Sequence, residues 1–120
     1  MGRTTVTRDV LSGSTNGRRI KVAATATPGT TIHTATAATG ALDFVTLYAQ
    51  NAHTADLLLT IEWGGTTSPD DLIQQTIVAR SGDTLIVAGL PLRGGLVIKA
   101  FCASANLVTI SGFIERGVEE

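Results

Sequence analysis

The chain has 120 residues and a formal net charge of −1, and 43% of its residues are hydrophobic, 16% charged and 4% aromatic. This length predicts one domain. So few charged residues argue against a disordered chain and against a helical bundle, whose exposed faces are usually rich in Glu, Lys and Arg. The composition favours a compact all-β body with largely neutral surfaces.

The charges are unevenly distributed along the chain. Residues 1–30 have five basic residues and one acidic residue, a net charge of +4, whereas residues 31–120 have four basic and nine acidic residues, a net charge of −5. A basic terminal segment on an acidic body is typical of an arm that meets an acidic partner. That partner is a nucleic acid, an acidic protein surface or a second copy of the chain. Single-stranded nucleic acid is the least favoured, because the segment has no aromatic residue for base stacking.

Residues 1–30 are predicted to form an extended or irregular arm. A short strand-like stretch, TTVTRDVL, is followed by the turn-forming SGSTNG, and RRIKVAATATPG resumes an extended pattern that stops at Pro28 and Gly29. The segment has too few large apolar side chains for a core of its own. We therefore expect something outside the arm to order it.

The stretch LDFVTLYAQNAHTADLLLTIEW, residues 42–63, is predicted to be a β-hairpin at the centre of the fold. Two apolar runs flank a polar turn, QNAHTAD, as in a hairpin with a loop of a few residues. In the second run alternation places Leu57, Leu59, Ile61 and Trp63 on one face. The opposite face takes Asp56, Leu58, Thr60 and Glu62. The only tryptophan is then an anchor at the end of an apolar row.

Strand signals recur at short intervals from residue 30 to residue 117. The segment 68–82 has features of a capped helix, but its β-branched residues favour a short turn over 69–72 followed by a strand. The regular spacing predicts an all-β fold, a single jelly-roll-like β-sandwich of about seven to eight strands. We place the basic extended N-terminal arm at residues 1–30 and the sandwich domain at residues 31–120.

The residues with reactive side chains do not form a pattern that predicts catalysis. His33 is expected on a strand surface and His53 in a turn, without the ligand cluster that zinc requires. Cys102 lies in the apolar run LVIKAFCAS and is expected to be a small buried residue; as the only cysteine it permits no intrachain disulfide. Asp70 and Asp71 are expected to shape a turn. No glycine-rich stretch has phosphate-binding spacing, so we predict no catalytic, cofactor or metal site.

Two groups of side chains leave alternatives open. The carboxylates of Asp43, Asp56 and Glu62 could converge on one face of the hairpin. The aromatic residues are expected mainly in the core, but exposed Tyr48 and Trp63 would form a platform for a glycan. These aromatics are Phe44, Tyr48, Trp63, Phe101 and Phe113.

The sequence contains no signal-peptide pattern after Met1, and no run approaches the roughly 18 apolar residues of a membrane helix. A single unpaired cysteine favours assembly in a reducing cytosol. We therefore expect neither a membrane nor a secretory route.

Residues 42–117 resemble small β-sandwich virion proteins of tailed bacteriophages. The resemblance lies in LYAQNAHTADLLLTIEWGG and in the later segments TLIVAGLPLRGGLVIKA and ANLVTISGF. It consists of a strand ending in an Asn-containing turn, a Thr/Leu-alternating strand and a final apolar strand. The basic segment 1–30 lies outside it.

This resemblance implies a structural protein of the virion, most simply a capsid cement or decoration protein. The expected partners are the major capsid protein and neighbouring copies of the chain in a homo-oligomer, with a trimer favoured, and neither nucleic acid nor membrane. The expected location is the virion, assembled in the host cytoplasm. The alternatives are a neck or tail subunit and a glycan-binding surface module. The residues expected to contact the capsid or a neighbouring subunit are Arg3, Arg8, Arg18, Arg19 and Lys21.

Overall fold

The computed structural model describes residues 4–119, and these residues form nine strands and no helix. The all-β prediction is therefore confirmed. The strands are β1 (Thr4–Val10), β2 (Ile20–Lys21), β3 (Thr30–Thr34), β4 (Ala41–Asn51), β5 (Leu57–Trp63), β6 (Leu72–Ile77), β7 (Thr84–Leu92), β8 (Val97–Cys102) and β9 (Val108–Glu119). The turn predicted before the strand at residue 72 is also present, since β6 begins there.

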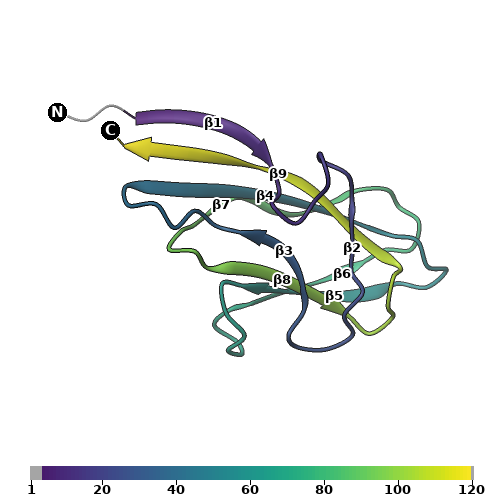
Figure 1. The fold of residues 1–120 in the computed structure, drawn as a ribbon. Coiled ribbons are helices and arrows are strands. Elements are labelled where there is room, and N and C mark those ends of the chain that lie inside the picture. Colours follow the sequence, from purple (N-terminus) through teal and green to yellow (C-terminus); the bar gives the residue numbers. More distant parts are fainter. Residues whose placement is uncertain (1–3, 120) are drawn as a thin grey trace.

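The strands form two antiparallel sheets that pack face to face, as in a β-sandwich (Figure 1). Sheet A has the strand order β1-β9-β4-β7, and β2 pairs with a further part of β9. Sheet B has the order β3-β8-β5-β6. In β4 every second residue, from Ala41 to Asn51, is buried, because alternate side chains of a strand point to opposite faces of its sheet.

The pairing between strands is nested along the chain. Strand β2 pairs with β9, β3 with β8, β4 with β7 and β5 with β6, each time antiparallel. Consecutive strands therefore alternate between the sheets through most of the chain. Each sheet is assembled from segments that are far apart in sequence.

The predicted hairpin of residues 42–63 is wrong, because its two strands lie in different sheets. Strand β4 pairs with β7 and β9, whereas β5 pairs with β6 and β8. The buried Asn51 holds the connecting loop. Its Nδ2 donates to the carbonyl oxygens of Ala55 and Ile77, both at 2.9 Å, and its Oδ1 accepts the His53 N–H at 2.8 Å. These bonds direct the chain across to sheet B instead of back along β4.

The first thirty residues belong to the sandwich from residue 4 onward, which differs from the arm expected to need an outside partner. All seven residues of β1 pair in register with β9. The loop after β1 contributes Leu11 to the buried core, β2 contributes Ile20, and the residue directly after β2 contributes Val22. These apolar residues are too widely spaced to form a recognisable pattern. They are buried because the segment crosses the edge of both sheets.

The core is aliphatic, and no Phe, Tyr or Trp side chain is fully buried among residues 4–119. Trp63 packs half-buried against the core, in part the anchor expected of it. Phe44 is 38% exposed on the outer side of sheet A, so the expectation of a core role is wrong for this residue. Cys102 is 1% exposed and free, as predicted for a small buried residue.

The outer side of sheet B carries a buried carboxylate. Glu62 is 1% exposed, although it faces away from the core of the sandwich. The connection between β2 and β3 folds over it: the Thr27 hydroxyl donates to its carboxylate at 2.5 Å and the Gly29 N–H donates at 2.7 Å. A buried carboxylate requires such partners, because leaving water without them costs several kcal/mol. Glu62 thus fastens this loop to sheet B.

Two glycines of β9 differ in the space around them. A Cβ at Gly112 would collide with the Thr46 carbonyl oxygen of β4, whereas a Cβ at Gly117 has no atom within 4 Å. We expect Gly112→Ala to lower the free energy of unfolding by about 1–3 kcal/mol, the usual cost of overpacking. Gly117→Ala is the matched control and is expected to leave stability unchanged or raised by up to about 1 kcal/mol. Urea unfolding measures both, and equal stabilities would contradict the close approach of β9 to β4.

Candidate functional site

The structure separates the predicted basic residues into different roles. Arg3 lies outside the described residues. Arg8, on β1, turns back onto its own sheet: its Nη2 is 3.2 Å from a Glu115 carboxylate oxygen, and its guanidinium carbon is 5.2 Å from the centre of the Phe113 ring. Both contacts lie across the β1–β9 pair. Arg8 is therefore engaged within the fold.

Arg19 is also paired internally. Its guanidinium forms a two-pronged contact with the Asp83 carboxylate, with Nη2 donating to Oδ2 at 2.7 Å and Nη1 donating to Oδ1. The contact joins the start of β2 to the loop between β6 and β7. The hydrogen bonds to Arg19 lower the pKa of Asp83, and the same bonds raise the pKa of Arg19.

Arg18 and Lys21 remain exposed and form no ion pair within residues 4–119. They line a hollow of about 550 Å³ at the β1–β2 connection, which we call the basic hollow. Sequence reasoning identified its cations and not its hydroxyls, although the run SGSTNG directly before the basic pair was a signal for a polar loop. The residues of the basic hollow are Gly13, Ser14, Thr15, Arg18, Arg19, Ile20 and Lys21.

Local hydrogen bonds shape the loop of the basic hollow. The Ser14 hydroxyl donates to the Leu11 carbonyl at 3.0 Å and accepts the Gly17 N–H at 3.2 Å. Asn16 and Gly17 both have positive φ, 53° and 87°, a conformation that Asn and Gly adopt most readily. The chain can therefore reverse tightly and present Arg18 directly before β2.

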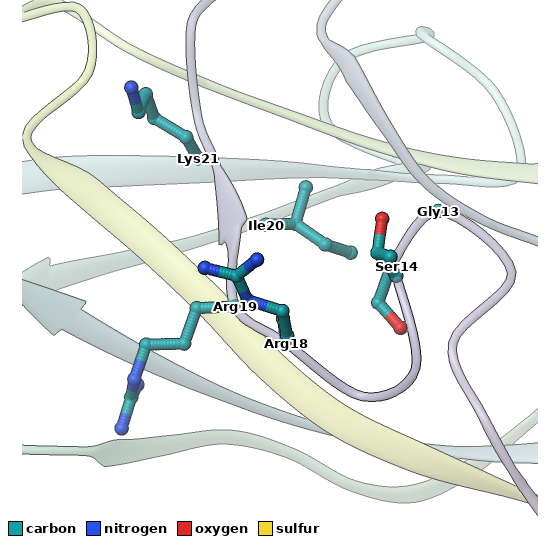
Figure 2. A pocket seen from close by; sticks show the side chains of 7 residues that line it. Gly13, Ser14, Arg18, Arg19, Ile20 and Lys21 are labelled. Atoms are coloured by element: carbon teal, nitrogen blue, oxygen red, sulfur yellow. The ribbon is translucent and has the colours of Figure 1, made fainter.

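The cationic groups of the hollow do not converge on one point. Figure 2 shows the Arg19 and Lys21 side chains diverging from each other, while the Arg18 guanidinium lies apart from both, near Ile20. A compact anion would be contacted by one of these groups at a time. The spread of charge suits an extended acidic surface better.

A second polar cluster lies buried between the sheets. Asp43, on β4, is fully buried, and its Oδ2 is 2.8 Å from His33 Nε2, while its Oδ1 accepts a hydrogen bond from Arg116 Nε at 2.6 Å. The Thr36 N–H donates to Oδ2 at 3.0 Å. Burial alone would raise the pKa of Asp43, but the hydrogen bonds from Arg116, His33 and Thr36 hold it below its usual value.

The histidine of this cluster is a buried structural residue, so its expected place on a strand surface is wrong. His33 is 1% exposed. Its Nδ1 accepts the Ser12 N–H at 3.0 Å, which leaves the proton on Nε2, where it is donated to Asp43. The combination of Ser12, His33 and Asp43 has the composition of a hydrolase triad. The Ser12 backbone N–H already occupies Nδ1 of His33, and Nε2 carries the proton donated to Asp43. The imidazole therefore has no nitrogen left to take a proton from the Ser12 hydroxyl.

The acidic side chains do not converge as one of the alternatives allowed. Asp43 lies between the sheets, Glu62 lies on the outer side of sheet B, and Asp56 accepts the Ala79 N–H at 2.9 Å in a loop. The turn role predicted for Asp71 is confirmed, since its Oδ2 accepts the Thr67 N–H at 3.1 Å. Within residues 4–119 no three His, Cys, Asp or Glu side chains are grouped closely enough to bind a metal.

Comparison of the chain with protein-family models, curated proteins and solved structures finds no match. The described part of the chain also has no helix that is long and apolar enough to cross a membrane. The fold and the two polar clusters are therefore the features from which a function can be inferred.

Because folding lowers the pKa of Asp43, the stability that its carboxylate contributes is fully present above the unfolded pKa of about 3.9. That contribution is lost as the pH falls through the folded pKa. We expect Asp43→Asn to lower the free energy of unfolding at pH 7 by about 3 kcal/mol, because it breaks a buried ion pair. The variant is also expected to lose less stability than the wild type between pH 5 and pH 2.

Urea unfolding at several pH values measures this difference. Asp70→Asn is the matched control, since Asp70 is exposed in the β5–β6 turn, and its effect is expected to stay within about 0.5 kcal/mol. Parallel pH profiles for wild type and Asp43→Asn would contradict the role of the carboxylate.

Proposed function

We propose that this chain is a structural protein of a bacteriophage virion, a capsid cement protein that binds and stabilises the head shell. The observation that carries the proposal is the basic hollow, where Arg18 and Lys21 are exposed, unpaired within the described residues, and held beside sheet A by the pairing of β2 with β9. The proposed partner is the acidic outer surface of the major capsid protein. Complementary charge of this kind orients a partner and speeds its association.

The strand order supports the proposal through the fold type. Strands β2 to β9 pair as β2–β9, β3–β8, β4–β7 and β5–β6, which is one long antiparallel hairpin rolled into two sheets. We assign this arrangement to the eight-stranded jelly roll, with β1 as an added strand. Jelly rolls occur in viral capsid proteins, lectins and cupins. The order is therefore compatible with the virion resemblance of residues 42–117.

The polar clusters support a structural role over a catalytic one. The buried group around Asp43 is used to join segments of the chain, and both ring nitrogens of His33 are occupied. A glycan-binding module receives less support, since Trp63 packs against the core. A neck or tail subunit would use the same surfaces at another place in the particle.

Binding to purified head shells tests the proposal. We expect Arg18→Gln/Lys21→Gln to weaken co-sedimentation with shells by about tenfold, which corresponds to about 0.7 kcal/mol for each surface charge. Binding of the wild type is expected to weaken as salt is added, and binding of the variant to depend less on salt. Occupancy per shell over a protein titration, at two salt concentrations, is the measurement.

The matched control is Arg80→Gln/Arg93→Gln, which removes the same charge from two exposed arginines outside the basic hollow. This control is expected to bind as the wild type does. Equal losses in both double variants would show that net charge, and not the hollow, governs binding. Unchanged binding of Arg18→Gln/Lys21→Gln would reject the hollow as the contact.

A further inference from the structure

Strand β1 is an open edge of sheet A. It pairs with β9 on one side, over seven consecutive residues without a register shift, and it is the first strand in the sheet order. Figure 1 shows it at the margin of the sheet, where no other strand of residues 4–119 lies beyond it. Its side chains from Val6 to Val10 are all exposed, and Val6 is 62% exposed. Such an edge is a template for a further strand.

Two other edges of the sandwich are protected. Strand β7 is interrupted by register shifts and contains Gly89, with φ of 66°, and Pro91. The edge of β3 is covered by Ser12 and Gly13, where the loop of the basic hollow begins. The Gly13 N–H donates to the Ile32 carbonyl at 2.9 Å, and the Thr34 N–H donates to the Ser12 hydroxyl at 2.7 Å. Bulges, prolines and covering loops are the usual means of blocking an edge.

The charged residues of β1 do not block its edge. Arg8 is drawn back over sheet A by Glu115 and Phe113. The carboxylate of Asp9 accepts the N–H of the next residue, Val10, at 2.7 Å. Five of the seven residues of the strand are Thr or Val, which favour β-structure. Strand β1 therefore has both the composition and the open side that strand addition requires.

We propose that β1 pairs with β1 of a second copy of this chain, antiparallel about a twofold axis through Thr7. A twofold axis perpendicular to the sheet leaves each side chain on the same face of the sheet in both copies. Residues directly opposite each other across the axis are therefore both even-numbered or both odd-numbered, so their numbers add to an even total. With the axis at Thr7 that total is 14, so Thr4 pairs with Val10, Thr5 with Asp9 and Val6 with Arg8. This register uses the whole strand, from Thr4 to Val10.

The charges in this register favour a second copy over other partners. Arg8 lies opposite Val6 of the other copy and Asp9 lies opposite Thr5, so no like charges face each other directly. The edge strand carries one positive and one negative charge, so its net charge is zero. An acidic shell would therefore gain little electrostatic attraction from binding it. The exposed Val6 and Val10 of the two copies would lie on one continuous outer face beside Phe113. The edge is thus self-complementary, as an interface across a twofold axis must be.

The length of the strand limits the strength of the pairing. Seven residues span about 23 Å, and pairing one edge buries less than the roughly 800 Å² per partner of a standard interface. We therefore expect weak dimers in dilute solution and stronger pairing where a surface holds two copies close together. This symmetry gives a dimer in place of the trimer favoured by the sequence.

Disulfide trapping of the purified chain tests the register without any shell. Residues opposite each other on antiparallel strands have Cα atoms about 4.5–5.5 Å apart, within the range that a disulfide spans. We expect Thr7→Cys, oxidised at the highest soluble concentration, to form a covalent dimer that a reductant reverses. Wild type is expected to form none, since its single Cys102 is 1% exposed.

Two controls fix the interpretation. Val6→Cys lies one position from the axis and faces Arg8 of the partner, so it is expected to give little covalent dimer. Thr66→Cys makes the same substitution at an exposed residue of the β5–β6 turn, outside every strand edge, and it too is expected to stay monomeric. Failure of Thr7→Cys to cross-link, or equal cross-linking of all three variants, would overturn the proposal.

A second pair of variants covers the case in which Thr7→Cys does not fold. Thr7→Lys and Thr7→Asp are each expected to be monomers by sedimentation, because the axis places like charges opposite each other. An equimolar mixture is expected to regain the dimer, and a mixture that stays monomeric overturns the proposal. Loss of shell binding in Arg18→Gln/Lys21→Gln is independent of these outcomes, so the two proposals can fail separately.

Discussion

The carboxylate of Asp43 is the constraint on which the two sheets and the N-terminal segment depend. It is fully buried and is bonded by His33 at the end of β3, Thr36 in the following loop and Arg116 on β9. His33 in turn accepts the Ser12 N–H of the N-terminal segment. Removing a carboxylate from water costs several kcal/mol, and only a complete set of partners offsets that cost. These segments therefore take up their positions together.

The same cluster fixes the register of the central strands. Asp43 and Arg116 are direct partners in the pairing of β4 with β9. Because side chains alternate across a strand, a slip of one residue would turn Asp43 to the outer face of sheet A and leave Arg116 without its carboxylate. Apolar residues alone specify the register less strictly, because alternation repeats every two residues. The ion pair thus selects one of several registers that would bury similar aliphatic side chains.

The sequence predicted the elements better than it predicted their partners. Runs rich in Thr, Val, Ile and Leu, bounded by Gly and Pro, correctly indicated strands, an all-β fold, the buried Cys102 and the turn before residue 72. The hairpin of residues 42–63 and the exposed His33 were wrong for a common reason. Strand pairing and burial are decided by segments far away, and Asp43 meets Arg116 73 residues further along the chain. The residues around Asp43 in the sequence do not indicate which distant residue it will contact.

Long-range contacts also determine which of the basic residues remain available to a partner. As a sequence, residues 1–30 carry five cations that look equally available, but Arg8 and Arg19 meet Glu115 and Asp83 of the body. The acidic excess of residues 31–120 is thus partly used to hold the N-terminal segment against the sandwich.

The exposed surface of the N-terminal segment has two parts, one before and one after the buried Leu11. After it come the cations Arg18 and Lys21, which suit an acidic surface. Before it comes β1, whose own charges are balanced and whose edge suits a copy of itself. The fold therefore converts one basic stretch of sequence into two surfaces with different chemistry. The capsid cement protein proposed above would need one surface for the shell and another for its neighbours.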